Sequence, residues 1–227
     1  MPNGTYLAAQ TWSAMLAGAA LGLAFGVAMA WLSALLPLRL CGLPRRPVRW
    51  RWPLAVAWCA GFGALAGLRY GISLPMALAV AGCSLMGLVA LIDLEHRVVP
   101  NALVAAGCVL GLLSRLGAPW PAWRAALIGA LLAGVSFALL AAVGRGAMGA
   151  GDVKLALLIG WWVAYPAVVR TLALGIVLGG IAAGFLLATG KRRPKQYMAY
   201  APYLAAGCAL VLVSCADGCA GLLRAGW

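Results

Sequence analysis

The sequence predicts an all-α, polytopic transmembrane bundle of about eight helices. Its composition is the first reason: 65% of the 227 residues are hydrophobic and 9% are charged, whereas a soluble globular domain carries about 25% charged residues. Its pattern is the second. Apolar runs recur between short stretches rich in Pro, Gly and Arg, and a run of roughly 20 apolar residues is the length that spans a bilayer as a helix.

The apolar runs place the expected helices in order along the chain. They lie at residues 7–36, 54–69, 73–94, 101–116, 125–143, 152–165, 170–190 and 200–217. The spans at 54–69, 101–116 and 152–165 are shorter than the usual ~20 residues, so they need flanking residues or a thinner membrane.

Small residues predict that these helices pack closely. The chain has 30 glycines, and in the first span Gly18, Gly22 and Gly26 recur every four residues, a spacing typical of helix contacts within lipid. We divide the chain into a first helix with a short basic loop, residues 1–53, and a membrane-embedded domain, residues 54–227.

The cations predict the orientation of the bundle. No Lys or Arg precedes Arg39, and alternation of the spans places twelve Lys and Arg on one side and five on the other. The richer side is expected to face the cytoplasm. The net charge of +13 does not indicate nucleic-acid binding, because the cations lie in short loops where they orient helices and meet anionic lipid.

The cysteines do not predict a metal site. All seven are scattered through apolar segments, and no CxxC pair occurs. Cys215 and Cys219 share a helix face but have no further ligands nearby. Buried thiols are therefore the simplest interpretation, and we expect neither a metal nor a cofactor.

Two of the four acidic residues are expected to meet. Asp93 ends the third span and Asp152 begins the sixth, and because two crossings separate them, both lie at the same membrane face. Two carboxylates at low dielectric can share one proton. One can then activate water as a general base while the other, protonated, polarises a carbonyl, which is the chemistry of aspartic proteolysis.

Each residue of this region also has a simpler interpretation. Asp152 could be a helix N-cap after a glycine turn, and Asp93 could pair with Arg97 at i+4. Lys154 could extend toward lipid headgroups, and Glu95 could lie in a solvated connection. Pro100 and Asn101 have the types of turn and helix-start residues, while the glycines at 144, 146, 149 and 151 allow positive φ and close approach of a substrate chain.

Three segments resemble a known family. "GAGD" at 149–152 fits the GxGD signature of intramembrane aspartic proteases. "ALIDLEHRVVPN" at 90–101 and "GAMGAGDVKL" at 146–155 resemble the two catalytic segments of bacterial type IV prepilin peptidases. "YMAYAPYLAAG" at 197–207 is similar to the entry into that family's last helix, and the likeness covers roughly residues 54–215.

The resemblance implies that Asp93 and Asp152 are the catalytic pair. The residues expected to bind substrate or shape the site are Gly149, Gly151, Lys154, Glu95, Pro100 and Asn101. The implied substrates are type IV prepilins or type II secretion pseudopilins, whose basic leader is cut at the cytoplasmic face of the bacterial inner membrane. The oligomeric state stays open.

One departure from the family concerns a second activity. Many members carry two CxxC pairs that hold zinc after the first helix, and they N-methylate the new amino terminus. The corresponding segment here, residues 36–53, has a single cysteine, Cys41. The sequence therefore predicts a short form with peptidase activity and argues against the methyltransferase.

Three other functions remain as alternatives. A presenilin-like protease is expected to carry a Pro-Ala-Leu motif, which this chain lacks. A proton-coupled transporter would use acidic residues near the middle of the membrane and some internal repeat, and neither is found. A catalytically silent assembly factor would not need both aspartates.

Overall fold

The computed structural model describes residues 3–43, 49–116, 119–143, 149–189 and 199–214. These residues form eight α-helices and, within the same ranges, no strand. The helices are α1 (Asn3–Cys41), α2 (Arg51–Tyr70), α3 (Leu74–His96), α4 (Asn101–Leu113), α5 (Trp120–Val143), α6 (Ala150–Val163), α7 (Ala167–Ala188) and α8 (Ala201–Ser214). The predicted all-α helical bundle is confirmed.

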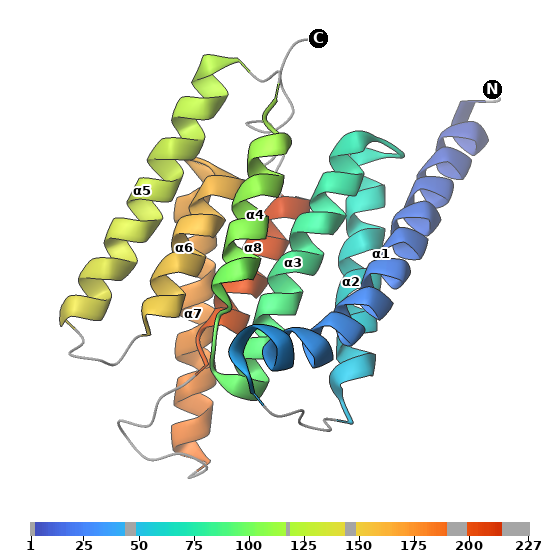
Figure 1. Cartoon of the computed structure of the whole chain (residues 1–227). Coiled ribbons are helices and arrows are strands. Elements are labelled where there is room, and N and C mark those ends of the chain that lie inside the picture. Colours follow the sequence, from blue (N-terminus) through green and yellow to red (C-terminus); the bar gives the residue numbers. More distant parts are fainter. Residues whose placement is uncertain (1–2, 44–48, 117–118, 144–148, 190–198, 215–227) are drawn as a thin grey trace.

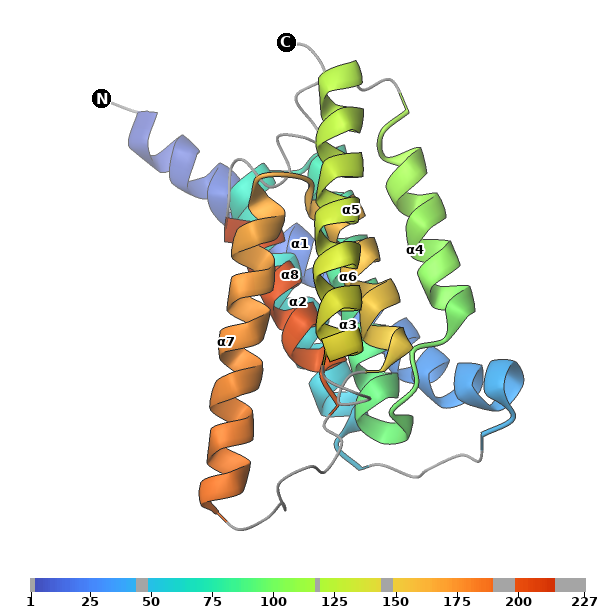
Figure 2. The ribbon, with the colours of Figure 1, turned by 90° about the vertical axis from the view of Figure 1, so that its left-hand side faces the viewer.

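The bundle runs up and down, with α1 and α5 at opposite sides (Figures 1 and 2). Among the described residues, four helical stretches are long and apolar enough to cross a membrane: Gln10–Cys41, Leu74–His96, Ala122–Val143 and Ala167–Ala188. Helices α4, α6 and α8 have 13, 14 and 14 residues. At 1.5 Å per residue they extend only about 20 Å, less than a typical hydrocarbon core of ~30 Å.

Helix α3 lies at the centre and contacts α1, α2, α4 and α8. Nearly every side chain from Val80 to Asp93 is buried, as expected for a helix that is apolar on all faces. The end of this central helix is therefore fixed by protein on several sides.

Glycines bring neighbouring helices into backbone contact. A Cβ on Gly22 of α1 would lie 2.1 Å from the carbonyl oxygen of Cys59 on α2, and one on Gly18 would lie 2.1 Å from that of Gly63. On the other side of the bundle, a Cβ on Gly160 of α6 would lie 2.2 Å from the carbonyl oxygen of Gly129 on α5. The close packing predicted from the glycine spacing in the first span is thus present.

Several helix ends differ from the prediction, chiefly at prolines. α1 continues through Pro37 to Cys41, and its last part runs across one end of the bundle (Figure 1). α2 begins at Arg51, so Pro53 lies in its first turn, where a missing N–H costs no helical hydrogen bond. Both prolines were expected to lie outside the helices.

Some predicted features fall outside the described residues. These include Gly144, Gly146, Asp217, Cys215, Cys219 and the basic residues Arg45, Arg46, Arg145, Lys191, Arg192, Arg193, Lys195 and Arg224. The charge asymmetry depends largely on these cations, so the orientation stays a prediction.

Candidate active site

Asp93 and Asp152 line one pocket at the end of the bundle where α3 ends and α6 begins. The pocket has a volume of about 290 Å³. Its lining comes from the end of α3, the segment that follows it and the first turn of α6: Asp93, Arg97, Val98, Val99, Gly149, Ala150, Gly151, Asp152 and Lys154. Two segments far apart in the sequence thus place their carboxyl groups around one space.

Asp93 lies in the last turn of α3 and is only 6% exposed. The backbone N–H of Ala201, at the start of α8, donates a hydrogen bond to its carboxyl group. Within the described part of the chain, Oδ2 of Asp93 is buried without a hydrogen-bond partner. Because a buried polar atom costs free energy unless it is paired, this oxygen is suited to hold a water or a substrate group from the pocket.

Arg97 ends α3 in the left-handed conformation, with φ 55°, and its N–H donates to the carbonyl oxygen of Asp93. A residue in this conformation stops a helix, and the chain then leaves along the pocket. The Asp93–Arg97 pair suggested by the i+4 spacing is not among the close ion pairs of the described residues, although Arg97 lines the same pocket and attracts the charge of Asp93. The left-handed turn replaces the i+4 geometry that the pair would need.

Asp152 is the third residue of α6 and is half-buried. The N-cap of this helix is Gly149, with φ −78° and ψ 149°, so the interpretation of Asp152 as an N-cap is wrong. Instead, its carboxyl group accepts a hydrogen bond from the backbone N–H of Gly149, the arrangement of an acidic residue at N3 in a capping box. The helix begins two residues earlier than predicted, so Asp152 lies within its first turn. From there Asp152 lines the pocket.

Neither of the two described glycines of the motif has unusual backbone angles, and Gly151 allows close packing. Gly149 has negative φ and Gly151 lies within α6, so the expected positive φ is not found at either. A Cβ on Gly151 would lie 3.1 Å from Cβ of Val99. Gly151 therefore allows the first turn of α6 to approach the segment that follows Asp93.

Lys154 and Asn101 join the two halves of the site. Nζ of Lys154 donates a hydrogen bond of 2.9 Å to Oδ1 of Asn101, the first residue of α4. Lys154 thus faces the pocket rather than extending only toward lipid. Pro100 is buried and is the N-cap residue of α4, so it helps to direct the chain from Asp93 to Asn101.

Glu95 is not in a solvated connection. It is 6% exposed and accepts two hydrogen bonds from Arg51, from Nε at 2.8 Å and from Nη2 at 2.6 Å. Nε2 of His96 lies 3.9 Å from the same carboxylate. The sequence pattern did not predict this partner, because Arg51 was expected to lie in a loop.

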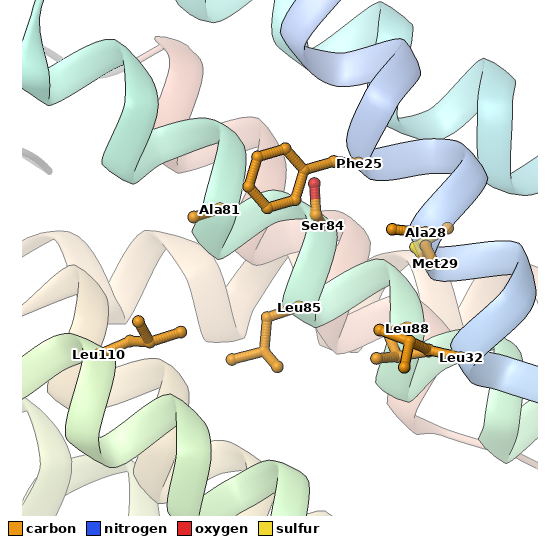
Figure 3. Close-up of a pocket in the computed structure, with 9 residues that line it drawn as sticks. All are labelled: Phe25, Ala28, Met29, Leu32, Ala81, Ser84, Leu85, Leu88 and Leu110. Carbon is orange, nitrogen blue, oxygen red and sulfur yellow. The ribbon is translucent and has the colours of Figure 1, made fainter. Parts of the chain in front are cut away.

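A second pocket is apolar and lacks groups that could activate water (Figure 3). It has a volume of about 190 Å³ and lies between α1, α3 and α4. Ser84 is the polar residue among those that line it, and its hydroxyl donates to the carbonyl oxygen of Val80. Among the described residues, no three His, Cys, Asp or Glu side chains gather as metal ligands. The carboxylate pocket is therefore the candidate active site.

Comparisons with known proteins point to one family. Residues 80–184, which include the whole pocket lining, match the model of the type IV leader peptidase family. The chain is 30% identical over 160 residues to a Bacillus subtilis protein named prepilin leader peptidase/N-methyltransferase, covering 70% of this chain and 64% of that protein. A protein of the same name from Pseudomonas putida is 31% identical over 173 residues, covering 73% of this chain and 59% of the relative.

A third relative of that name, from Myxococcus xanthus, is 30% identical over 174 residues. The matched region covers 74% of this chain and 51% of that protein. The chain thus spans between about half and two thirds of the length of these curated relatives. No solved structure matches. The segment that carries both aspartates, residues 80–184, is thus similar to the type IV leader peptidase family.

Proposed function

We propose that this chain is a membrane aspartic endopeptidase that removes the leader peptide of type IV prepilins or of type II secretion pseudopilins. The observation that carries the proposal is the pocket of about 290 Å³ that Asp93 and Asp152 line together. The family match supports the substrate class, since the relatives are named prepilin leader peptidases.

In the proposed mechanism the two carboxyl groups share one proton. The ionised carboxylate takes a proton from water as the water oxygen attacks the carbonyl carbon of the scissile peptide bond. The protonated carboxyl group donates to the carbonyl oxygen, so that a neutral tetrahedral diol forms. Transfer of a proton to the leaving nitrogen then breaks the C–N bond and releases the leader.

The surroundings of the two groups suit this division of work. Burial disfavours charge on Asp152, and the N–H of Gly149 together with the positive end of the α6 dipole partly offsets this cost. Oδ2 of Asp93, unpaired among the described residues, is available to a substrate or water. Cleavage at the cytoplasmic face follows if the cation-rich side faces the cytoplasm.

The proposal is tested with purified protein and a prepilin in detergent or liposomes, with the products measured by mass spectrometry. Asp93→Asn and Asp152→Asn are each expected to abolish leader cleavage while the protein still accumulates in the membrane. Asp217→Asn, the matched removal of a carboxylate elsewhere in the chain, is expected to retain cleavage. Normal cleavage by either active-site variant would contradict the assignment.

The same mass measurement tests the second activity named for the relatives. We expect a product with a free, unmethylated amino terminus even when S-adenosylmethionine is supplied, because residues 36–53 contain one cysteine and cannot form a four-cysteine zinc site. A product that gains the mass of a methyl group would refute this expectation and leave the peptidase assignment intact.

A further inference from the structure

A buried ion pair lies beside the candidate active site and joins α2 to α3. Arg51 and Glu95 meet through two hydrogen bonds, Nε to Oε1 at 2.8 Å and Nη2 to Oε2 at 2.6 Å. Their side chains are 9% and 0% exposed. Such a paired, planar contact restricts both the distance and the rotation of the groups that it joins.

Neither residue is explained by the electrostatics of its own helix. Arg51 is the first residue of α2, and the first turn of that helix contains no acidic residue. Glu95 lies in the last turn of α3. A cation is unfavourable at a helix N-terminus and an anion at a C-terminus, and burial adds a desolvation cost. The two residues compensate for each other, so the pair fixes the arrangement of these two helix ends.

The pair acts on the turn that carries Asp93. Residues two positions apart on a helix point about 200° away from each other, so Glu95 and Asp93 lie on nearly opposite faces of α3. Glu95 is held by α2, whereas Asp93 accepts a hydrogen bond from the N–H of Ala201 of α8 and faces the pocket. The last turn of α3 is thus fixed from both sides.

We propose that Arg51 is a positioning residue for Asp93: through Glu95 it holds the last turn of α3 at the position and rotation that the reaction needs. This inference rests on the proposed peptidase function. It assigns a role in the reaction to a residue of α2 that lies outside the matched segment, residues 80–184.

The test compares kcat and KM of leader cleavage for Arg51→Gln, Arg51→Lys and the exchanged pair Arg51→Glu/Glu95→Arg. Arg49→Gln is the matched control, since Arg49 is exposed and lies two residues away. We expect Arg51→Gln to lower kcat by on the order of 10- to 100-fold, the effect of displacing a catalytic group by a fraction of an ångström to an ångström. KM should change by less than about twofold, because the pair does not line the pocket.

Rescue separates positioning from a general need for a polar residue. Arg51→Lys keeps the charge but loses the paired geometry, so its kcat should lie between those of Arg51→Gln and the wild type. The exchanged pair should regain part of the kcat lost in Arg51→Gln. Each kcat is divided by the fraction of folded protein, measured by thermal unfolding. A normalised kcat of Arg51→Gln equal to that of Arg49→Gln would overturn the inference.

Amide hydrogen exchange gives a readout that does not depend on cleavage. The N–H of Arg97 is bonded to the carbonyl oxygen of Asp93, and its exchange should accelerate in Arg51→Gln but not in Arg49→Gln. Unchanged exchange would overturn the inference. A wild-type protein that leaves prepilin intact would overturn the proposed function as well, whereas an active wild type with an equally active Arg51→Gln would overturn this inference alone.

Discussion

Around Asp93 and Asp152, single backbone groups decide how the carboxyl groups lie. Asp93 accepts from the N–H of Ala201, and Asp152 from the N–H of Gly149. Both donors belong to the first turns of helices, whose N–H groups have no partner within the helix. The ends of α6 and α8 therefore orient the two carboxyl groups without requiring a polar side chain.

Gly151 is expected to control how closely the two halves of the site approach. A Cβ at this position would lie 3.1 Å from Cβ of Val99, so Gly151→Val should move the first turn of α6 away from the segment after Asp93. Overpacking of this kind costs about 1–3 kcal/mol. If this free energy is lost from the transition state, leader cleavage should fall by about 5- to 160-fold when initial rates are measured at saturating substrate.

A second substitution makes that prediction specific. Val99→Ala removes Cγ2, one of the two side-chain atoms of Val99 that a Cβ at 151 would meet, so Gly151→Ala should be less active alone than in combination with Val99→Ala. Equal activity of the Gly151→Ala variant with and without Val99→Ala would show that the contact does not set the geometry of the site.

At the scale of the helices, apolar runs were sufficient to predict the elements but not their ends. α1 and α2 include Pro37 and Pro53, which were expected to lie outside helices, because a proline in a first turn or at a bend is tolerated when tertiary contacts support the helix. The sequence did predict that Asp93 and Asp152 share an end of the bundle, since this requires only counting crossings.

The other contacts of the site depend on helix depth and rotation, which an apolar run does not specify. The Arg51–Glu95 pair needs α2 to begin three residues earlier than expected. The bond from Lys154 to Asn101 needs α4 and α6 to begin side by side. A cation at the start of one helix and an anion at the end of the next was the signal that could have indicated the ion pair.

The contact between α1 and α2 is expected to tolerate no side chain at Gly22. A Cβ there would lie 2.1 Å from the carbonyl oxygen of Cys59, so Gly22→Ala should force the two backbones apart. We expect a loss of about 1–3 kcal/mol, measured as a lower midpoint of thermal unfolding in detergent.

Gly61→Ala is the matched control on α2, because a Cβ at that position meets no atom within 4 Å. Replacing an exposed helical glycine by alanine removes a cost of up to about 1 kcal/mol, so this variant should be as stable as the wild type or more stable. Equal unfolding midpoints for Gly22→Ala and Gly61→Ala would contradict the backbone contact.

Across the whole molecule, the proposed reaction requires that the pocket open to the cytoplasm. Native cysteines offer a direct measurement. Cys41 is exposed at the end of α1, and the ion pair of Arg51 places the start of α2 beside the end of α3, at the same end as the pocket. Cys59, Cys83 and Cys208 are buried, so they should react slowly with an aqueous reagent.

We expect a membrane-impermeant maleimide to label Cys41 in inside-out vesicles and not in spheroplasts, in a variant with Cys215→Ser and Cys219→Ser. The control adds Cys41→Ser and Leu116→Cys to that variant, because Leu116 follows α4 at the opposite end and is 67% exposed. It should show the reverse pattern. If Cys41 reacts only from the outer side, the pocket faces away from the cytoplasm and leader cleavage at the cytoplasmic face is excluded. Such a result would also show that the excess of Lys and Arg does not set the orientation of this chain.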